Sequence, residues 1–318
     1  MDRKRIKIAI LGMGGVGGYI GGMLAGKFHH SEEAEIIFIA RGENLAVIKE
    51  RGLKLITNDK EFTVNPDKIT GKPEEVGNID LLICCVKSYD LEESLQTIKH
   101  CITDETIILS LLNGIESAER ISKLFPGAEV WEACIYIVSK LIAPGLVKQS
   151  GELKQVYFGS SGRLTEKMNQ INKLFNEAGI SSTITEDISS VIWKKFLFIS
   201  PLASFTSAYN VNIGTIVSNP GYKQALLGLI NELKVIAIAK GIILTEQDVN
   251  NMIERILKLP HDSTTSMHND FKRGNKTEVD SLTGIVVKLG QDLKIDTPLY
   301  DELLEKLKTK IEISTVRT

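Results

Sequence analysis

The sequence predicts an α/β domain built on a parallel sheet, followed by an all-helical domain, and two observations lead to this fold class. In the first half, short apolar runs alternate with segments of helical period, as expected for a parallel sheet with helices on both faces. From about residue 187, long helical segments follow one another without strand-like runs of comparable quality. We therefore expect an α/β domain at 1–186 and a helical domain at 187–318.

The individual elements follow from the same patterns. The predicted buried strands are 6–11, 35–40, 80–86 and 106–112, and the first helices are 15–28, 43–51, 90–99 and 115–124. Residues 52–66 predict a hairpin turning at Asn58 and Asp59. The first domain is completed by a strand-rich piece at 129–159, a helix at 164–177 and a strand at 181–184. The helices expected in the second domain are 187–206, 221–241, 245–258, 278–292 and 298–312.

Composition narrows the class of function. The formal net charge of −2 argues against a protein that binds nucleic acid through a broad basic field. No window approaches the roughly 20 apolar residues that span a bilayer, and the basic, apolar start is not followed by a plausible cleavage site. The four cysteines show no paired metal-ligand spacing. We therefore predict a cytoplasmic, enzyme-sized protein without a metal site.

A glycine-rich run follows the first predicted strand and opens the first predicted helix. It consists of Gly12, Met13, Gly14, Gly15, Val16 and Gly17. Its G-x-G-x-x-G spacing suits a Rossmann-type domain, where the first glycine permits a tight turn, the second lets a pyrophosphate approach and the third lets helix and strand pack closely. Free N–H groups at the helix N-terminus then face the anion. This context predicts a dinucleotide site, and a structural turn without a ligand is the alternative.

The residue after the second predicted strand indicates which nucleotide is bound. An NAD site usually carries Asp or Glu there to bind the ribose 2′-hydroxyl, whereas Arg41 and Gly42 follow this strand. A guanidinium group can bind a 2′-phosphate through charge-assisted hydrogen bonds, which favours NADP(H) over NAD(H). The alternative is that Arg41 is a solvated loop residue.

Two further polar residues follow predicted strands, at the edge where open α/β sheets bind ligands. Lys87 comes after the strand at 80–86, and Asn113 with Gly114 comes after the strand at 106–112. Both side chains are well placed to contact a nicotinamide or a substrate. Turn chemistry alone also explains an Asn-Gly pair, and Lys87 can equally be a surface lysine.

Two adjacent lysines interrupt the apolar run "SSVIWKKFLFISPLASF" of the second domain. On a helix, Lys195 shares a packing face with Val191, Phe198 and Leu202, whereas we expect Lys194 to be solvated. Partial desolvation disfavours the charged form of a lysine and eases release of its proton. Such a lysine can stabilise or protonate the alkoxide that hydride transfer creates. The alternative is a buried stem whose charged head reaches water.

Polar side chains gather again in the segment "TTSMHNDFKRGNKTEVDSLTG" at 264–284. They are Ser266, Asp270, Glu278 and Asp280, placed around a turn-like "RGNK". We expect Glu278 in the first turn of the next helix. An acid there can also do no more than complement the helix dipole.

These motifs together resemble the 2-dehydropantoate 2-reductases (ketopantoate reductases), relatives of 6-phosphogluconate dehydrogenase in their helical second domain. The resemblance runs in order over nearly the whole chain, through "GMGGVGG", the arginine after the second strand, "VKSYD", "NG", "WKKF" and "SMHNDFKRGNKTEVDSLTG". It implies that Lys195 is the catalytic acid and that Glu278 orients it or the substrate hydroxyl. It also implies that Ser266 binds the substrate carboxylate, that Asn113 bridges cofactor and substrate, and that Lys87 lies at the nicotinamide end.

One departure from the family pattern concerns the substrate pocket. The family commonly has asparagines four and eight residues after its lysine, where this chain has Ile199 and Ala203. Neither side chain can hydrogen-bond a substrate oxygen, and such a contact is worth roughly 1–3 kcal/mol. Ser200 and Ser204 lie one residue further along and could bind substrate instead if the helix rotates or kinks at Pro201.

The resemblance therefore implies NADPH-dependent reduction of 2-dehydropantoate to pantoate, a step of pantothenate and coenzyme A synthesis, and we expect the substrate in a cleft between the domains whose closure excludes water. One alternative is a related reductase of another 2-oxo acid with a more apolar pocket. Another is a non-catalytic NADP(H)-binding sensor, against which the retention of Lys195 and Glu278 argues. We expect a small-molecule 2-oxo acid as partner, with neither nucleic acid nor membrane, and leave a homodimer open.

Overall fold

The computed structural model describes residues 5–160 and 163–316, and the chain divides into two compact units. The first unit comprises Met1–Leu112 and Glu116–Ile188, and the second comprises Asn113–Ile115 and Ser189–Thr318. The boundary predicted at 186 lies next to the change of unit at Ile188. No local sequence pattern indicates that the short piece Asn113–Ile115 belongs with the helical unit.

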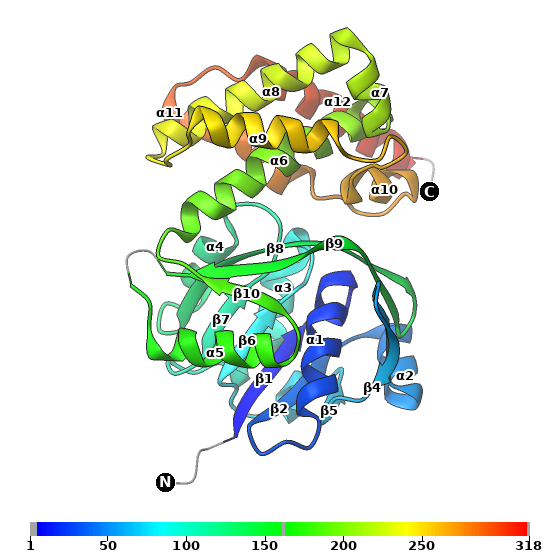
Figure 1. The fold of residues 1–318 in the computed structure, drawn as a ribbon, viewed down its shortest axis with the longest axis vertical. Coiled ribbons are helices and arrows are strands. Elements are labelled where there is room, and N and C mark those ends of the chain that lie inside the picture. The colour runs from blue at the N-terminus through cyan, green and yellow to red at the C-terminus, as the bar shows by residue number, and fades with distance from the viewer. Residues whose placement is uncertain (1–4, 161–162, 317–318) are drawn as a thin grey trace. The chain divides into compact units, whose positions relative to one another are not determined.

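The first unit is built on a single ten-stranded sheet (Figure 1). The strands are β1 (Ile6–Leu11), β2 (Ala34–Ile39), β3 (Leu53–Ile56), β4 (Glu61–Val64), β5 (Lys68–Thr70), β6 (Leu81–Cys84), β7 (Ile107–Ser110), β8 (Glu129–Ala143), β9 (Leu146–Gly159) and β10 (Ser181–Ile184). Their order is β4-β3-β9-β8-β7-β6-β1-β2-β5, with β10 beside β9. The four predicted buried strands and the hairpin are confirmed. The short strand β5 was missed.

The sheet is mixed: the predicted parallel strands are extended by antiparallel pairs. The strands from β8 through β7, β6, β1 and β2 to β5 are parallel, as the alternation of strands and helices predicts. The pairs β8–β9 and β3–β4 are antiparallel. They are antiparallel because short turns join them, whereas parallel neighbours need a crossover connection.

The helices of the first unit occupy the predicted segments. They are α1 (Gly15–Phe28), α2 (Gly42–Arg51), α3 (Leu91–Ile98), α4 (Ser117–Leu124) and α5 (Glu166–Glu177), with short 3-10 helices η1 (Pro73–Glu75), η2 (Ser88–Asp90) and η3 (Lys99–Cys101). Helix α1 is buried over most of its length, because glycines let it approach its neighbours closely. A Cβ on Gly18 would lie 2.5 Å from Val147 Cγ2 of β9.

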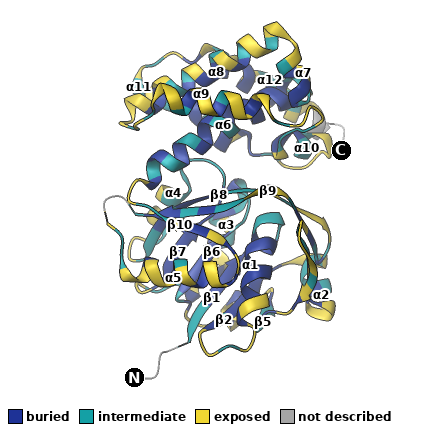
Figure 2. Cartoon of the chain, viewed as in Figure 1, coloured by how far each residue is buried: buried dark blue, intermediate teal, exposed yellow. Residues whose placement is uncertain are grey.

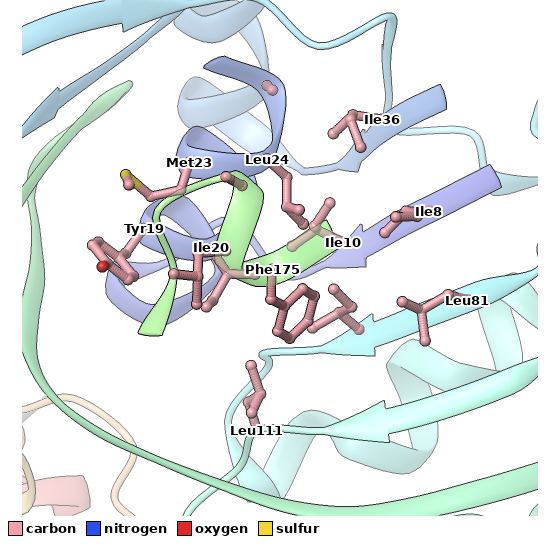
Figure 3. Close-up of a cluster of buried hydrophobic side chains, with 14 of the residues drawn as sticks. Ile8, Ile10, Tyr19, Ile20, Met23, Leu24, Ile36, Leu81, Leu111 and Phe175 are labelled. Carbon is pink, nitrogen blue, oxygen red and sulfur yellow. The ribbon is translucent and has the colours of Figure 1, made fainter. Parts of the chain in front are cut away.

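The main core of the first unit lies between α1, α5 and the parallel strands. Figure 3 shows Ile8 and Ile10 of β1 beside Ile20 and Leu24 of α1, with Phe175 of α5 next to them. All five side chains are fully buried. Each such burial contributes roughly 1.5–3 kcal/mol, so this core holds α1 and α5 against β1.

The second unit is helical. Its elements are α6 (Ile188–Tyr209), α7 (Ile213–Ser218), α8 (Pro220–Ala239), α9 (Glu246–Leu257), α10 (Ser266–Lys272), the π-helical segment η4 (Asp280–Gly284), α11 (Ile285–Leu293) and α12 (Pro298–Val316). The predicted long helices are confirmed. The short helices α7 and α10 were missed, since a helix of six or seven residues carries little periodic signal.

Helix α6 contributes several buried apolar residues to the core of the helical unit. Among residues 5–160 and 163–316, it is the one helix long and apolar enough to meet the length and hydropathy criteria for a membrane span, which corrects the statement that no window comes close. However, 67% of the qualifying window is buried, and Figure 2 shows the helix mostly in the colours of buried and intermediate residues. These properties are those of a core helix, and α6 packs in the main apolar cluster of its unit.

Candidate active site

The glycine-rich turn of the first unit has the conformation expected of a dinucleotide site. Gly12 follows β1 with a φ of 94°, and a Cβ there would lie 2.8 Å from Val86 Cγ1. A Cβ on Gly17 would lie 1.9 Å from the Gly12 carbonyl oxygen, so only glycine lets α1 start so close to the strand. Apart from the adjoining residues of the chain, no protein atom lies within 4 Å of the corresponding position on Gly14. The turn therefore leaves open the side from which a pyrophosphate would approach the N-terminus of α1.

Two side chains that were not predicted hold this turn. Asn44 Nδ2 of α2 donates to the Met13 carbonyl at 2.8 Å, and Asn44 Oδ1 accepts from the Gly145 amide at 2.7 Å. Ser139 Oγ donates to the Gly15 carbonyl at 2.7 Å. The turn is thus fixed by α2 and by the β8–β9 hairpin. No local pattern reveals these bonds, because Ser139 is 124 residues from its partner.

Arg41 lies where the sequence predicts, directly before α2 and at the same sheet edge as the glycine turn. Its side chain is 78% exposed, and Nη2 lies 3.0 Å from Asp90 Oδ2. Asp90 ends η2, which follows β6 on the other side of β1. The guanidinium group of Arg41 is therefore accessible from solvent, but it already has a carboxylate partner. Asp90 stands within the quoted motif "VKSYD", and its role was not predicted.

Lys87 lies directly before η2, in the loop that follows β6. Its side chain is partly buried. The loop is held by Arg120, whose Nη2 donates to the Ser88 carbonyl at 2.8 Å and whose guanidinium group binds both carboxylate oxygens of Glu92. This loop is at the carboxyl edge of the parallel strands, as predicted. Contact of Lys87 with a nicotinamide stays a prediction.

In the helical unit the two adjacent lysines have different environments. Lys195 is 9% exposed, and its Nζ donates to Asn113 Oδ1 at 2.9 Å. Lys194 lies at the surface and forms an ion pair with Asp248 at 2.9 Å. The predicted contrast between a buried and a solvated lysine is confirmed.

The Lys194 ammonium group, together with bonds from Thr245, lowers the pKa of Asp248 to about 2.

The partner of Lys195 comes from the short piece Asn113–Ile115 that belongs to the helical unit. Asn113 is followed by Gly114, which has a φ of 100° that other residues rarely adopt. A Cβ on Gly114 would lie 3.3 Å from the Ser281 carbonyl oxygen. The Asn-Gly pair is therefore both a tight turn and the means of placing an amide oxygen against the lysine.

The acidic and hydroxyl candidates of the segment 264–284 are in different surroundings. Glu278 is 3% exposed and immediately precedes the helical turn that leads into η4, rather than lying inside the first turn of a long helix. Ser266 begins α10 and is exposed. The neighbouring Thr265 is tied to α6 through a 2.9 Å contact between its Oγ1 and Thr206 Oγ1. Substrate and cofactor contacts of Glu278 and Ser266 remain predictions.

Ser200 and Ser204 do not have the surroundings of substrate ligands. Both are fully buried, and α6 is helical through Pro201. Ser200 Oγ donates to the Leu282 carbonyl at 2.6 Å, and Ser204 Oγ lies 2.7 Å from Thr283 Oγ1. Their hydroxyl groups are used inside the protein, so the structure does not support the prediction that they bind substrate in place of the family asparagines.

One group of side chains among the described residues has the chemistry of metal ligands. The group comprises His29, His30 and Asp67, whose ligand atoms lie within 4.8 Å of one another. Asp67 already accepts hydrogen bonds from Arg5 Nη2 at 2.7 Å and from the backbone of His30 and Ile36. These bonds and the Arg5 charge outweigh the effect of partial burial and hold the pKa of Asp67 below its usual value. A metal ion would have to displace Arg5, so we assign no metal site here.

Comparison with known proteins agrees with the fold and the motifs. The family described as "Ketopantoate reductase PanE/ApbA" matches residues 8–163, and its C-terminal counterpart matches residues 187–311. The 2-dehydropantoate 2-reductase of Pyrococcus horikoshii is 29% identical over 96% of this chain and 97% of its own length.

Two solved structures give the same picture. The crystal structure of 2-dehydropantoate 2-reductase from Porphyromonas gingivalis W83 has a TM-score of 0.83 and 32% identity, covering 95% of this chain and 99% of that one. The ternary structure of D-mandelate dehydrogenase with NADH and anilino(oxo)acetate has a TM-score of 0.86 and 26% identity, covering 98% and 100%. Because the family matches both halves of the chain, this protein belongs to the ketopantoate reductase family of oxidoreductases, with a Rossmann-type first unit and a helical second unit.

Proposed function

We propose that this protein reduces 2-dehydropantoate to pantoate with NADPH, as a step towards pantothenate and coenzyme A, and that Lys195 is the general acid. The observation that carries the proposal is the Lys195 amine, buried in the helical unit and bonded to Asn113 Oδ1 at 2.9 Å. An ammonium group has three N–H donors, and the bond to Asn113 uses one and fixes its direction. A family of 2-oxo acid reductases needs such a held proton source.

The first unit supplies the residues that would hold the cofactor. The open side of Gly14 and the N-terminus of α1 fit a pyrophosphate, and Arg41 fits a 2′-phosphate. Lys87 is proposed for the nicotinamide end, and Asn113 and Glu278 of the helical unit for contacts shared with the cofactor. When bound, NADPH supplies the hydride.

The chain's own part in the reaction is to hold and deliver a proton. As the substrate carbonyl becomes an alkoxide, Lys195 Nζ neutralises the charge and transfers its proton to that oxygen. Asn113 keeps Nζ oriented throughout. We assign to Glu278 the orientation of the amine or of the new hydroxyl, and to Ser266 the binding of the substrate carboxylate.

A second candidate is reduction of a different, more apolar 2-oxo acid. It is favoured by Ile199, which is only partly buried and stands where the family commonly has an asparagine; Ala203, at the other such position, packs in the apolar core of the helical unit. The similarity to D-mandelate dehydrogenase is in line with this alternative, since that protein was crystallised with an aromatic 2-oxo acid derivative and NADH.

The test is the loss of NADPH and NADH absorbance with a panel of 2-oxo acids: 2-dehydropantoate, 2-oxoisovalerate, pyruvate and phenylglyoxylate. We expect the highest kcat/KM with 2-dehydropantoate and NADPH. Turnover confined to phenylglyoxylate or another apolar member would replace the first candidate by the second. Tight NADPH binding without turnover of any member would contradict both and leave a sensor.

A further inference from the structure

The segment η4 is unusual within the helical unit because Asp280–Gly284 forms a π-helix, which begins two residues after Glu278. A π-helical turn has poorer hydrogen-bond geometry than an α-helical one and is found mostly as a single turn, often at functional sites. Something in the surrounding protein must therefore stabilise this turn. The residues packed against it from other elements identify what does so.

Two hydroxyl groups of helix α6 form hydrogen bonds with the π-helical segment. Ser200 Oγ donates to the Leu282 carbonyl at 2.6 Å and lies 2.8 Å from the hydroxyl of Tyr300. Ser204 Oγ lies 2.7 Å from Thr283 Oγ1. All five residues are fully buried, so water cannot replace these bonds. Burial also raises the pKa of Tyr300, which keeps its phenol neutral.

The same π-helical segment contacts the residues around Lys195. The Ser281 carbonyl oxygen is 3.3 Å from the position of a Cβ on Gly114, directly after the Asn113 that accepts from Lys195. Ser281 Oγ donates to the Glu278 carbonyl at 3.3 Å. One face of η4 thus rests on α6, while another rests on the Asn-Gly turn and on Glu278.

These contacts form a closed circuit within the helical unit. Lys195 on α6 is bonded to Asn113, and the adjacent Gly114 lies against the π-helical segment. That segment is bonded in turn to the two serines of α6, five and nine residues after the lysine. Because all three residues belong to one helix, the serines set the distance between the π-helical segment and the lysine.

We propose that Ser200 and Ser204 are positioning residues, which hold the π-helical segment so that Asn113 and Glu278 are correctly placed around Lys195 Nζ. The inference rests on the proposed role of Lys195 as proton donor. It explains why these hydroxyl groups are buried against Leu282 and Thr283 rather than turned toward substrate. Loss of either hydroxyl lets the segment shift, and the amide oxygen then no longer fixes the amine.

The experiment is a double-mutant cycle of Ser204→Ala and Thr283→Val, measured as kcat and KM on the best 2-oxo acid, with Ser200→Ala alongside. We expect each single variant to lower kcat about tenfold, since small displacements of catalytic groups have such effects, and the double variant to lose little more. The dissociation constant of NADPH should be unchanged. The alkaline limb of the pH profile of kcat should move to lower pH, because a displaced Asn113 no longer favours the charged amine.

Ser207→Ala is the matched control. Ser207 is a buried serine on the same helix, and its hydroxyl has no hydrogen-bond partner among the described residues. We expect it to leave kcat and the pH profile as in the parent. A lower melting temperature in Ser200→Ala and Ser204→Ala with parental kcat and pH profile would overturn the inference, as would independent effects of Ser204→Ala and Thr283→Val.

A readout without turnover separates this inference from the proposed function. Amide hydrogen exchange over residues 113–115 and 278–284 should become faster in Ser200→Ala and Ser204→Ala but not in Ser207→Ala. If the parent protein reduces no 2-oxo acid and exchange is still faster, the function fails and the positioning role stands. If the parent is active and exchange at both segments is unaltered, the positioning role fails and the function stands.

Discussion

The groups that we propose as ligand-binding are built in different ways in the two units. In the first unit the groups belong mainly to the backbone: glycines clear a space at the start of α1, and the N–H groups of that helix face it. In the second unit they are side chains on a buried helix, and Lys195 depends on an amide from a distant part of the chain. A backbone site is sensitive to an added atom, whereas a side-chain site is sensitive to the loss of a partner. The two units should therefore respond differently to substitution.

The largest effect should come from Lys195→Ala. We expect kcat to fall about 10²–10⁴-fold, the usual contribution of a general acid, while the NADPH dissociation constant stays within about threefold. Steady-state kinetics and fluorescence titration of NADPH measure the two quantities. Lys194→Ala is the matched control, because it removes the neighbouring lysine but only a surface ion pair, and kcat should be nearly unchanged. Equal losses of turnover and of cofactor affinity in Lys195→Ala would contradict its role as the acid.

The glycine turn offers a pair of substitutions that separate folding from binding. In Gly17→Ala the new Cβ would lie 1.9 Å from the Gly12 carbonyl oxygen, so we expect the free energy of unfolding to drop by about 1–3 kcal/mol and NADPH binding to weaken. In Gly14→Ala the new methyl group meets no protein atom within 4 Å, so the melting temperature should stay the same while NADPH binding weakens. Unchanged NADPH affinity in Gly14→Ala would show that the open side of the turn is not the phosphate site.

The choice between NADPH and NADH should respond to Arg41 and to its partner Asp90. We expect Arg41→Ala to weaken NADPH binding about tenfold or more through the loss of charge-assisted hydrogen bonds, with little change for NADH. Asp90→Asn removes the carboxylate that competes for Arg41 and should strengthen NADPH binding by a factor of about two to five, since a surface ion pair is weak. Titrations with both nucleotides test this, and parallel changes for NADPH and NADH would exclude a 2′-phosphate contact.

The smallest effect concerns stability in acid. His268 of α10 is buried, with Nε2 2.8 Å from Asn210 Oδ1, and burial with nearby lysines lowers its pKa to about 4 from 6.5. The unfolded chain therefore binds a proton more readily than the folded one between these values. Stability should be full above pH 6.5 and fall by about 2 kcal/mol as the pH drops toward 4.

Denaturant unfolding across that pH range measures the acid effect. His268→Gln should be less stable at neutral pH but should lose less stability between pH 6.5 and 4. His100→Gln, at an exposed position of the first unit, should keep the parental pH dependence. A parental dependence in His268→Gln would mean that other groups are responsible.

The comparison also explains which parts of the structure could be predicted. The glycine turn, the long helices and the buried strands depend on neighbouring residues, so their patterns were sufficient. The burial of Lys195 followed from helical spacing. The roles of Asn44, Ser139 and Asp90 depend on contacts between residues 31 to 124 positions apart, which no local pattern encodes. The contacts of Ser200 and Ser204 with Leu282 and Thr283 could not be predicted, because the π-helical segment has no sequence periodicity that distinguishes it from an α-helix.

The short piece Asn113–Ile115 has a consequence for how this protein can be divided. Peptide bonds at Leu112–Asn113, Ile115–Glu116 and Ile188–Ser189 cross between the units, so the helical unit is not encoded by one continuous stretch of the gene. A fragment starting at Ser189 would keep its helices but would lack the amide oxygen that faces its lysine. If residues 1–188 were replaced by the nucleotide-binding domain of another protein, the hydrogen bond to Lys195 would be kept only if that domain also carried an equivalent Asn-Gly turn.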